Sequence, residues 1–203
     1  MKIGVLNLEI GNIHSVFSAI NNLGFNTQIL DNAFDLDNCS HLIIPGIGNY
    51  NKLMNLVLKK NYGKEIQKFA KTGKPILGIC AGMQILSTFG YENEKAKGLN
   101  LIPGNVVSLK TDNEINDLPH IGWNSVRLIK KNKLLQNIKD LSDFYFVHSY
   151  HFELDDTSNS LAKTQYLQEF NSIINYKNIF GVQFHPEKSQ KNGLRLLHNF
   201  CSI

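Results

Sequence analysis

Residues 75–84 read Pro75-Ile76-Leu77-Gly78-Ile79-Cys80-Ala81-Gly82-Met83-Gln84, and this stretch decides the fold. An apolar run with the character of a buried strand ends in Gly-x-Cys-x-Gly and turns into a helical pattern. This is the layout of a nucleophile elbow, with the sulfur of Cys80 in place of a serine oxygen. The glycines permit a very tight turn, and a helix start supplies N–H groups that favour a thiolate and a developing oxyanion. A buried apolar cysteine between a strand and a helix would show the same pattern.

The chain on the N-terminal side of this stretch alternates between apolar runs and helical spacing. Buried strands are predicted at residues 2–8, 25–30 and 41–44, and in the run that ends at Cys80. Helices are predicted at residues 13–23, 50–59 and 63–72. A turn at Gly11-Asn12 precedes the first helix, and Gly24 ends it. Strands that alternate with helices imply parallel crossovers, so this half is predicted to be an α/β layered sheet.

The second half of the chain is richer in strands. Strand patterns cover residues 98–110, 120–129, 144–150, 161–166, 171–176 and 179–184. Helical spacing is confined to residues 131–139 and 189–201. The sequence therefore predicts an α/β fold in a single domain over residues 1–203. Its core is a mostly parallel open sheet flanked by helices, with an added antiparallel portion.

Composition narrows the class of protein. The 203 residues are 42% hydrophobic and 19% charged, which is typical of a soluble globular domain with a substantial core. The net charge is +4 and the lysine clusters are short, so we expect solvated surface and no nucleic-acid partner. Three distant cysteines argue against a disulfide framework and for a reducing compartment. Because no signal-peptide pattern or membrane-spanning run is recognised, we expect a cytoplasmic protein with no membrane partner.

A catalytic cysteine needs a base, because only about 3% of an unperturbed thiol is ionised at pH 7. One of the seven histidines is suited to this role, in Gly181-Val182-Gln183-Phe184-His185-Pro186-Glu187. An apolar strand ends at His185, and positions i and i+2 of an extended chain share a face. Glu187 can then bond one ring nitrogen while the other faces Cys80 at the carboxyl edge of the sheet. His-Pro-Glu alone also fits a strand-end turn with a solvated acid.

Together these motifs resemble the class I glutamine amidotransferase domain, and within that family the glutaminase subunits of imidazole glycerol phosphate synthases. The resemblance covers nearly the whole chain. It rests on the segments at residues 11–16, 45–48, 78–84, 119–124, 144–150 and 183–189. The cysteine elbow and His-Pro-Glu mark the superfamily, and Pro-His-Ile-Gly-Trp-Asn, Val-His-Ser-Tyr and Glu-Lys-Ser mark the subfamily.

The resemblance implies hydrolysis of glutamine to glutamate and ammonia. We expect no cofactor or metal, because the sequence has no Walker-type glycine loop, no dinucleotide fingerprint and no plausible metal cluster. Cys80 would attack the side-chain amide, His185 would shuttle the proton and Glu187 would orient His185. The oxyanion would be met by the backbone at Gly46 and Gly48 and by the N–H of Ala81, although the two glycines also fit an ordinary turn. The positions that correspond to the glutamine pocket are Gln84, Glu92, Ser149 and Tyr150, with Glu92 taking the α-amino group. Solvated polar positions are the alternative for these four.

The resemblance also implies a partner, a (β/α)8-barrel synthase subunit that receives the ammonia in a heterodimer. The residues that match motifs at that interface are Asn12, Pro119, His120, Trp123, Tyr145 and Lys188. Large aromatic side chains at exposed turns commonly anchor interfaces, which supports Trp123; a core tryptophan with a satisfied N–H is the alternative. We expect the glutaminase to be nearly idle alone and to be switched on by the synthase.

Two departures from the family pattern bear on the partner more than on the reaction. Asn7-Leu8-Glu9 stands where the family has aspartate-tyrosine-glycine, and Ala81 stands where leucine is common. Related glutaminases supply ammonia for sugar amidination in surface-polysaccharide pathways, and this is the leading alternative. Two further alternatives are a binding subunit without catalytic activity, or a stand-alone hydrolase or peptidase of the same fold.

Overall fold

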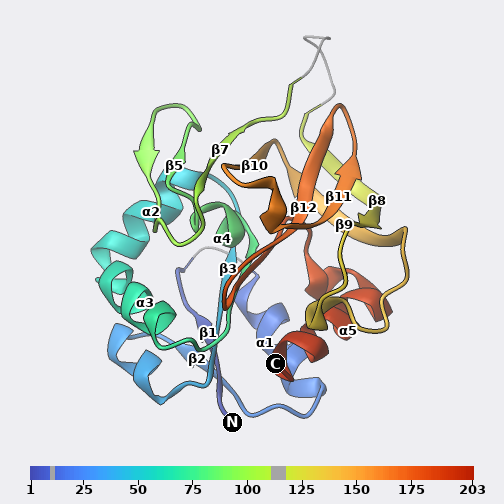
Figure 1. Ribbon diagram of the computed structural model, residues 1–203. Coiled ribbons are helices and arrows are strands. Elements are labelled where there is room, and N and C mark those ends of the chain that lie inside the picture. Colours follow the sequence, from blue (N-terminus) through green and yellow to red (C-terminus); the bar gives the residue numbers. More distant parts are fainter. Residues whose placement is uncertain (10–11, 111–117) are drawn as a thin grey trace.

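A nine-stranded sheet forms the centre of the computed structural model, which describes residues 1–9, 12–110 and 118–203 (Figure 1). In spatial order its strands are β2 (Thr27–Leu30), β1 (Ile3–Leu6), β3 (His41–Gly46), β4 (Ile76–Cys80), β13 (Ile179–Val182), β12 (Glu169–Tyr176), β11 (Ser160–Gln165), β8 (His120–Leu128) and β9 (Ser142–His148). The pairings from β2 to β13 are parallel, and those from β13 to β9 are antiparallel. The predicted α/β fold with an added antiparallel portion is confirmed. Gly11, placed in a turn by the sequence, lies outside the described residues.

Helices cover both faces of the parallel part, because alternate strand residues are apolar on each side. On one face, α1 (Ile13–Asn22) and α5 (Gln190–Cys201) pack on residues such as Val5 and Ile43. On the other, α2 (Tyr50–Lys59) and α3 (Tyr62–Lys71) pack on residues such as Leu42 and Ile44. The short helix α4 (Ala81–Gln84) follows β4 directly. Each face therefore has its own hydrophobic core, and the helices predicted at 13–23, 50–59, 63–72 and 189–201 are present.

A second, four-stranded sheet was not anticipated from the sequence. Its order is β10 (Tyr150–Leu154), β7 (Gly104–Ser108), β5 (Phe89–Gly90) and β6 (Ala96–Lys97). The predicted strand at 144–150 is interrupted at Ser149, where the chain leaves β9 in the large sheet and enters β10 in the small one. The predicted strand at 98–110 begins only at Gly104, after Pro103. The sheet junction at Ser149 becomes important at the site below.

The helix predicted at 131–139 is wrong, because only η2 (Lys133–Leu135) forms there, as a 3-10 turn. The side chain of Asn132 accepts a hydrogen bond from Leu134 N, and Asn137 has a φ of 60°, a left-handed value that ends any helix. Three further 3-10 turns are η1 (Ala33–Asn38), η3 (Thr157–Asn159) and η4 (Pro186–Lys188).

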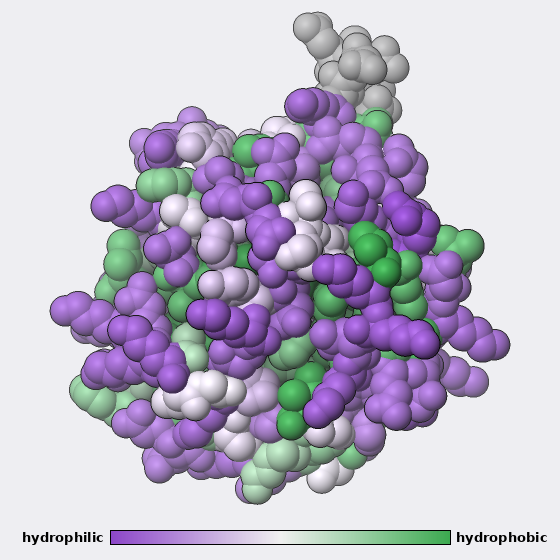
Figure 2. Space-filling model, viewed as in Figure 1, coloured by the Kyte–Doolittle hydropathy of each residue, from purple (hydrophilic) through white to green (hydrophobic). Residues whose placement is uncertain are grey.

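Polar side chains cover most of the face shown in Figure 2, with apolar residues scattered between them. Within the described part of the chain, no helix combines the length and the apolar character needed to cross a membrane.

Candidate active site

Cys80 occupies a strained turn between β4 and α4. Its backbone has φ 54° and ψ −116°, outside the regions that L-residues ordinarily adopt. A Cβ on Gly82 would lie 1.8 Å from Ile44 O, and one on Gly78 would lie 2.6 Å from Gly82 O. Both glycines are therefore required by close backbone approach. The Gly-x-Cys-x-Gly pattern encodes a true strand–turn–helix elbow, and backbone strain of this kind is concentrated at functional sites.

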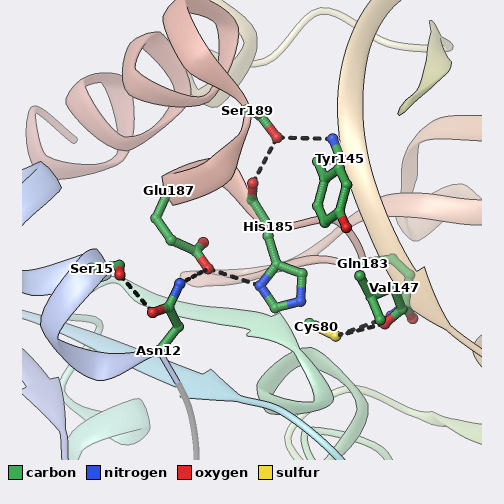
Figure 3. Close-up of polar contacts among 9 residues, drawn as sticks. All are labelled: Asn12, Ser15, Cys80, Tyr145, Val147, Gln183, His185, Glu187 and Ser189. Carbon is green, nitrogen blue, oxygen red and sulfur yellow. Dashed lines mark hydrogen bonds and ion pairs between the residues drawn. The ribbon is translucent and has the colours of Figure 1, made fainter. Parts of the chain in front are cut away.

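His185 meets Cys80 because their strands are neighbours. β4 and β13 pair in parallel with Val182 opposite Ile79, so both chains emerge at the same sheet edge. Figure 3 shows the imidazole ring between the Glu187 carboxylate and the Cys80 sulfur. Burial acts to lower the pKa of His185, but hydrogen bonds to Cys80 and Glu187 and the charges of both outweigh it and raise the pKa to about 10. The ring therefore holds its proton firmly at neutral pH.

Glu187 fixes the orientation of the His185 ring. Its Oε1 lies 2.8 Å from His185 Nδ1, and the two side chains are 0% and 4% exposed. A carboxylate accepts, so Nδ1 carries the proton and Nε2 is the nitrogen left for Cys80. The same oxygen accepts a hydrogen bond from Asn12 Nδ2 at 3.3 Å, and Ser15 Oγ donates to Asn12 Oδ1 at 2.5 Å (Figure 3). Helix α1 thus supports the carboxylate from behind.

Replacing Glu187 with glutamine should lower the pKa of the His185 ring, because the amide removes the charge that stabilises the imidazolium. The rate of a reaction that starts at Cys80 should fall by up to about 10⁴-fold, the effect seen when the acid behind a catalytic histidine is replaced by its amide. The ring pKa is measured by NMR titration of the His185 signals, with the exposed Glu94→Gln as control. An unchanged ring pKa in Glu187→Gln would show that the carboxylate does not act on His185.

The backbone of His185 is tied to β9 through Ser189. His185 N donates to Tyr145 O at 2.9 Å, and Ser189 Oγ donates to His185 O at 2.6 Å. Tyr145 N in turn donates to Ser189 Oγ at 3.0 Å (Figure 3). The serine of the Glu-Lys-Ser motif therefore locks the histidine onto the neighbouring strand. Sequence reasoning used Ser189 only as a family marker.

A cleft of about 240 Å³ opens beside Cys80. Its lining comprises Gly48, Asn49, Cys80, Ala81, Gln84, Glu92, Pro119, Val147, His148, Ser149 and Tyr150. It unites all the predicted pocket residues, with Gly46 paired to Cys80 in the sheet just behind. A larger cleft of about 660 Å³ at residues 128–138 contains none of them. We therefore take the smaller cleft as the candidate active site, because it contains Cys80 and the polar residues expected around it.

Two amide side chains order the floor of this cleft. Gln84 Nε2 donates to Tyr150 O at 2.9 Å and to Gln183 Oε1 at 3.1 Å. Gln183 Nε2 lies 3.9 Å from the Cys80 sulfur, and the Gln183 side chain is fully buried. Sequence reasoning missed Gln183, although its place two residues before His185 on an apolar strand was a usable signal.

Glu92 makes hydrogen bonds that hold the start of helix α2 in place. Its Oε2 accepts a hydrogen bond of 2.6 Å from Tyr50 N at the start of α2, and its backbone oxygen accepts from Asn51 Nδ2 at 3.0 Å. A carboxylate at a helix N-terminus is favoured by the helix dipole. Glu92 therefore lines the cleft while one of its oxygens binds the first N–H of α2, and its second oxygen takes no part in that bond.

The residues predicted for a partner interface fall into two groups. Trp123 is 49% exposed, which excludes a core role; its ring lies 6.0 Å from that of Tyr145, and Lys188 Nζ lies 5.8 Å from the Tyr145 ring centre. These three form an outward cluster. Asn12 instead faces Glu187, and Pro119 lies exposed at the cleft.

The expectation for His120 needs correction. It is 3% exposed and its ring is stacked 4.0 Å from Tyr166 and 4.9 Å from Phe146, so it cannot contact a partner directly. The sequence placed it at the interface with its strand neighbours, but alternation along β8 turns His120 inward.

Comparisons with known proteins show the family to which the chain belongs. The model of the family described as glutamine amidotransferase class-I matches residues 5–202. The chain is 42% identical over 202 residues to the imidazole glycerol phosphate synthase subunit HisH of Methanocaldococcus jannaschii, covering 99% of both chains. It is 42% identical over 203 residues to the protein of the same name from Blochmanniella floridana, covering 100% of both.

Solved structures share the fold at lower identity. A structure described as a glutamine amidotransferase has a TM-score of 0.76 at 19% identity, covering 98% of this chain and 97% of that one. A glutamine amidotransferase from Thermotoga maritima has a TM-score of 0.67 at 18% identity, covering 100% of this chain and 83% of that one.

Proposed function

The chain belongs to the class I glutamine amidotransferase family, and from this premise we propose that it is the glutaminase subunit of an imidazole glycerol phosphate synthase, acting in histidine biosynthesis. One observation carries the chemistry: the parallel strands β4 and β13 bring Cys80 and His185 to one sheet edge, with Glu187 bonded to the far side of the ring. We treat residues 1–203 as one glutaminase domain.

The geometry supports a two-step hydrolysis. The Cys80 thiolate attacks the carbonyl carbon of the glutamine side-chain amide, and its negative charge passes to the carbonyl oxygen. The oxyanion is met by backbone N–H groups at Ala81 and in the segment from Gly46 to Gly48. His185 Nε2 gives its proton to the departing ammonia, which leaves a thioester. Water then attacks the thioester, His185 takes the proton of that water, and glutamate is released.

The cleft supplies the contacts expected for a free amino acid. Glu92 offers a carboxylate to the α-ammonium group, and Gln84 offers its amide oxygen. Ser149 and Tyr150 also line the cleft. Selective hydrogen bonding of this kind rejects analogues that lack the amino-acid head group.

The ammonia passes to a (β/α)8-barrel synthase subunit that makes imidazole glycerol phosphate and AICAR. The surface offered to that partner consists of Pro119, Trp123, Tyr145 and Lys188, whereas Asn12, also expected there, faces Glu187. A half-exposed tryptophan next to a tyrosine and a lysine has the composition of an interface anchor.

The sugar-amidinating role is the second candidate, and one feature favours it. Glu9, in the departure Asn7-Leu8-Glu9, has a φ of 58° and pairs with Lys60 at 2.8 Å, while Asn7 Nδ2 donates to Asp31 Oδ1 at 2.7 Å. The departure is therefore built into the local structure beyond the end of β1, where it contacts Asp31 and Lys60. It leaves the residues that line the cleft unchanged.

The test is glutamate release from glutamine by the full chain, alone and with the imidazole glycerol phosphate synthase barrel and its nucleotide ligand. We expect slow release alone and stimulation of at least about tenfold with the barrel, the scale of a typical coupling free energy. A chain that labels at Cys80 with a chloroketone analogue of glutamine but gains nothing from the barrel would favour the sugar-amidinating partner. A folded chain that fails to label would reject the glutaminase itself.

A further inference from the structure

Two buried histidines outside the mechanism above form a hydrogen-bonded pair. His120 on β8 and His148 on β9 are cross-strand partners, 3% and 6% exposed. His120 Nδ1 lies 3.0 Å from His148 Nε2. We call these two residues the histidine pair. They lie on the inner face of the β8–β9 hairpin, opposite the outward cluster of Trp123, Tyr145 and Lys188.

Backbone groups fix the hydrogen-bond direction at both ends of the pair. His148 Nδ1 lies 2.9 Å from Tyr150 O, and a carbonyl only accepts, so this nitrogen carries a proton. At the other end, Asn124 Oδ1 accepts from Ser125 N at 2.8 Å and Asn124 Nδ2 donates to Gln165 O at 3.0 Å. The amide of Asn124 is therefore oriented by main-chain partners, and its Nδ2 lies 3.3 Å from His120 Nε2 as a donor.

Only one arrangement of protons satisfies every contact. Asn124 donates to His120 Nε2, His120 Nδ1 donates to His148 Nε2, and His148 Nδ1 donates to Tyr150 O. Each ring is neutral and carries one proton, on Nδ1. A further proton on either ring would set two N–H groups against each other. Burial agrees with this, because it lowers the pKa of His120 to about 4 and, with smaller contributions, that of His148 to about 3.

The series of hydrogen bonds that runs from Asn124 through His120 and His148 ends at Tyr150 O, at the junction between the two sheets. His148 is the last residue of β9 and Tyr150 is the first of β10, so the bond between them spans the turn at Ser149. Tyr150 O also accepts from Gln84 Nε2, whose second proton goes to Gln183 Oε1. With both amide protons used, the oxygen of Gln84 is the end of that side chain that a substrate donor can meet.

We propose that His120 and His148 are positioning residues of the glutamine pocket: as a neutral pair they hold the Tyr150 peptide, and through it the amide of Gln84, in the orientation that binds the amino-acid head group. This inference rests on the proposed function. It assigns the pair no contact with the reacting atoms. Its effect falls on recognition of glutamine and leaves the reactivity of Cys80 intact.

The test compares two reagents for Cys80 in the full-length chain. A chloroketone analogue of glutamine needs the head-group pocket, whereas iodoacetamide needs only the sulfur. His148→Phe should slow chloroketone labelling about tenfold, which corresponds to roughly 1.4 kcal/mol, and change iodoacetamide labelling less than about twofold. His148→Asn keeps an N–H at the place of Nδ1 and should label within about threefold of the unchanged chain.

Several results would overturn the proposal. Equal rates of chloroketone labelling in His148→Phe and the unchanged chain would do so. A parallel fall in the labelling rates of both reagents would do so as well. If the chloroketone does not label Cys80 in the unchanged chain, the proposed function is rejected, and this inference with it. If His148→Phe does not fold, His120→Phe keeps an aromatic ring between Phe146 and Tyr166, and it should show the same selective loss. The control is His14→Asn, at an exposed position of α1.

Acid stability gives a second readout. The pKa values of His120 and His148 in the folded chain lie below the ordinary 6.5, so the unfolded chain binds protons at a higher pH than the folded chain does. The contribution of the pair to the free energy of unfolding is therefore full above pH 6.5 and is lost as the pH falls toward 4. Two other titratable groups lie near His148. Burial also lowers the pKa of His151, whereas the raised pKa of His185 makes the free energy of unfolding independent of pH below 6.5 as far as that residue is concerned. The urea midpoint should fall less between pH 6.5 and 5 in His148→Asn than in the unchanged chain. An identical slope would show that the pair is not held neutral.

Discussion

Cys80→Ala should reduce glutamate release by at least about 10⁴-fold in the presence of the synthase barrel, because removal of a nucleophile abolishes the covalent step. Binding of glutamine should survive, since the cleft lining is otherwise unchanged. The free energy of unfolding should change by less than about 1.5 kcal/mol, because alanine removes one buried atom and keeps the same backbone requirement at φ 54°. Release is measured by a coupled glutamate assay, and glutamine binding by calorimetry.

Cys201→Ala is the matched control for this variant. Cys201 is fully buried on α5, and burial raises the pKa of its thiol to about 12, so it is not a nucleophile. Its replacement should leave turnover and chloroketone labelling of Cys80 unchanged. Residual release above about 1% in Cys80→Ala would contradict the assigned mechanism.

Gly82→Ala should destabilise the fold by more than about 3 kcal/mol, the scale of a severe steric conflict in a packed interior. The new Cβ would lie 1.8 Å from Ile44 O and 3.2 Å from Pro45 C, both of them backbone atoms of β3 that cannot rotate away. Relief requires α4 to move from β3, which displaces Ala81 and Cys80 together. Activity should therefore be lost even in molecules that remain folded. Urea unfolding followed by circular dichroism measures the first effect.

Gly63→Ala supplies the comparison. Gly63 lies in α3, where the nearest neighbour of an added Cβ is Val57 Cγ1 at 3.8 Å, an ordinary contact. Alanine is favoured over glycine in a helix by up to about 1 kcal/mol, so this variant should be neutral or slightly more stable. If Gly82→Ala also lay within about 1 kcal/mol of the unchanged chain, the close packing of α4 on β3 would be wrong.

The parts of the fold and site that the sequence could predict are those with local signals. The apolar run into Cys80 and the run into His185 each indicate a buried strand, and parallel topology then brings their ends to one edge. Glu187 follows from the i, i+2 geometry of an extended segment. Trp123 lies on the surface as expected, but within strand β8 and not in the exposed turn from which that expectation was argued.

The parts that could not be predicted depend on distant partners. Leu134, Leu135 and Ile138 have helix-like spacing, yet the left-handed backbone of Asn137 prevents a helix, and no propensity scale shows this. The small sheet joins β5 to β7 and β10, so no single segment reveals it. The roles of Gln183, His120 and His148 depend on hydrogen bonds between strands far apart in sequence, which a pattern along one strand does not contain.

Side chains along β8 alternate between an outward face and an inward face, so substitutions on the two faces have different consequences. Ile121 and Trp123 point outward and are 60% and 49% exposed, whereas His120 and Asn124 beside them belong to the hydrogen-bonded chain of the histidine pair. Substitutions at the outward positions alter what the hairpin can dock against, and they leave the hydrogen bonds toward Tyr150 untouched. A glutaminase built this way can acquire a new synthase partner by drift at every second residue while the inherited pocket stays the same.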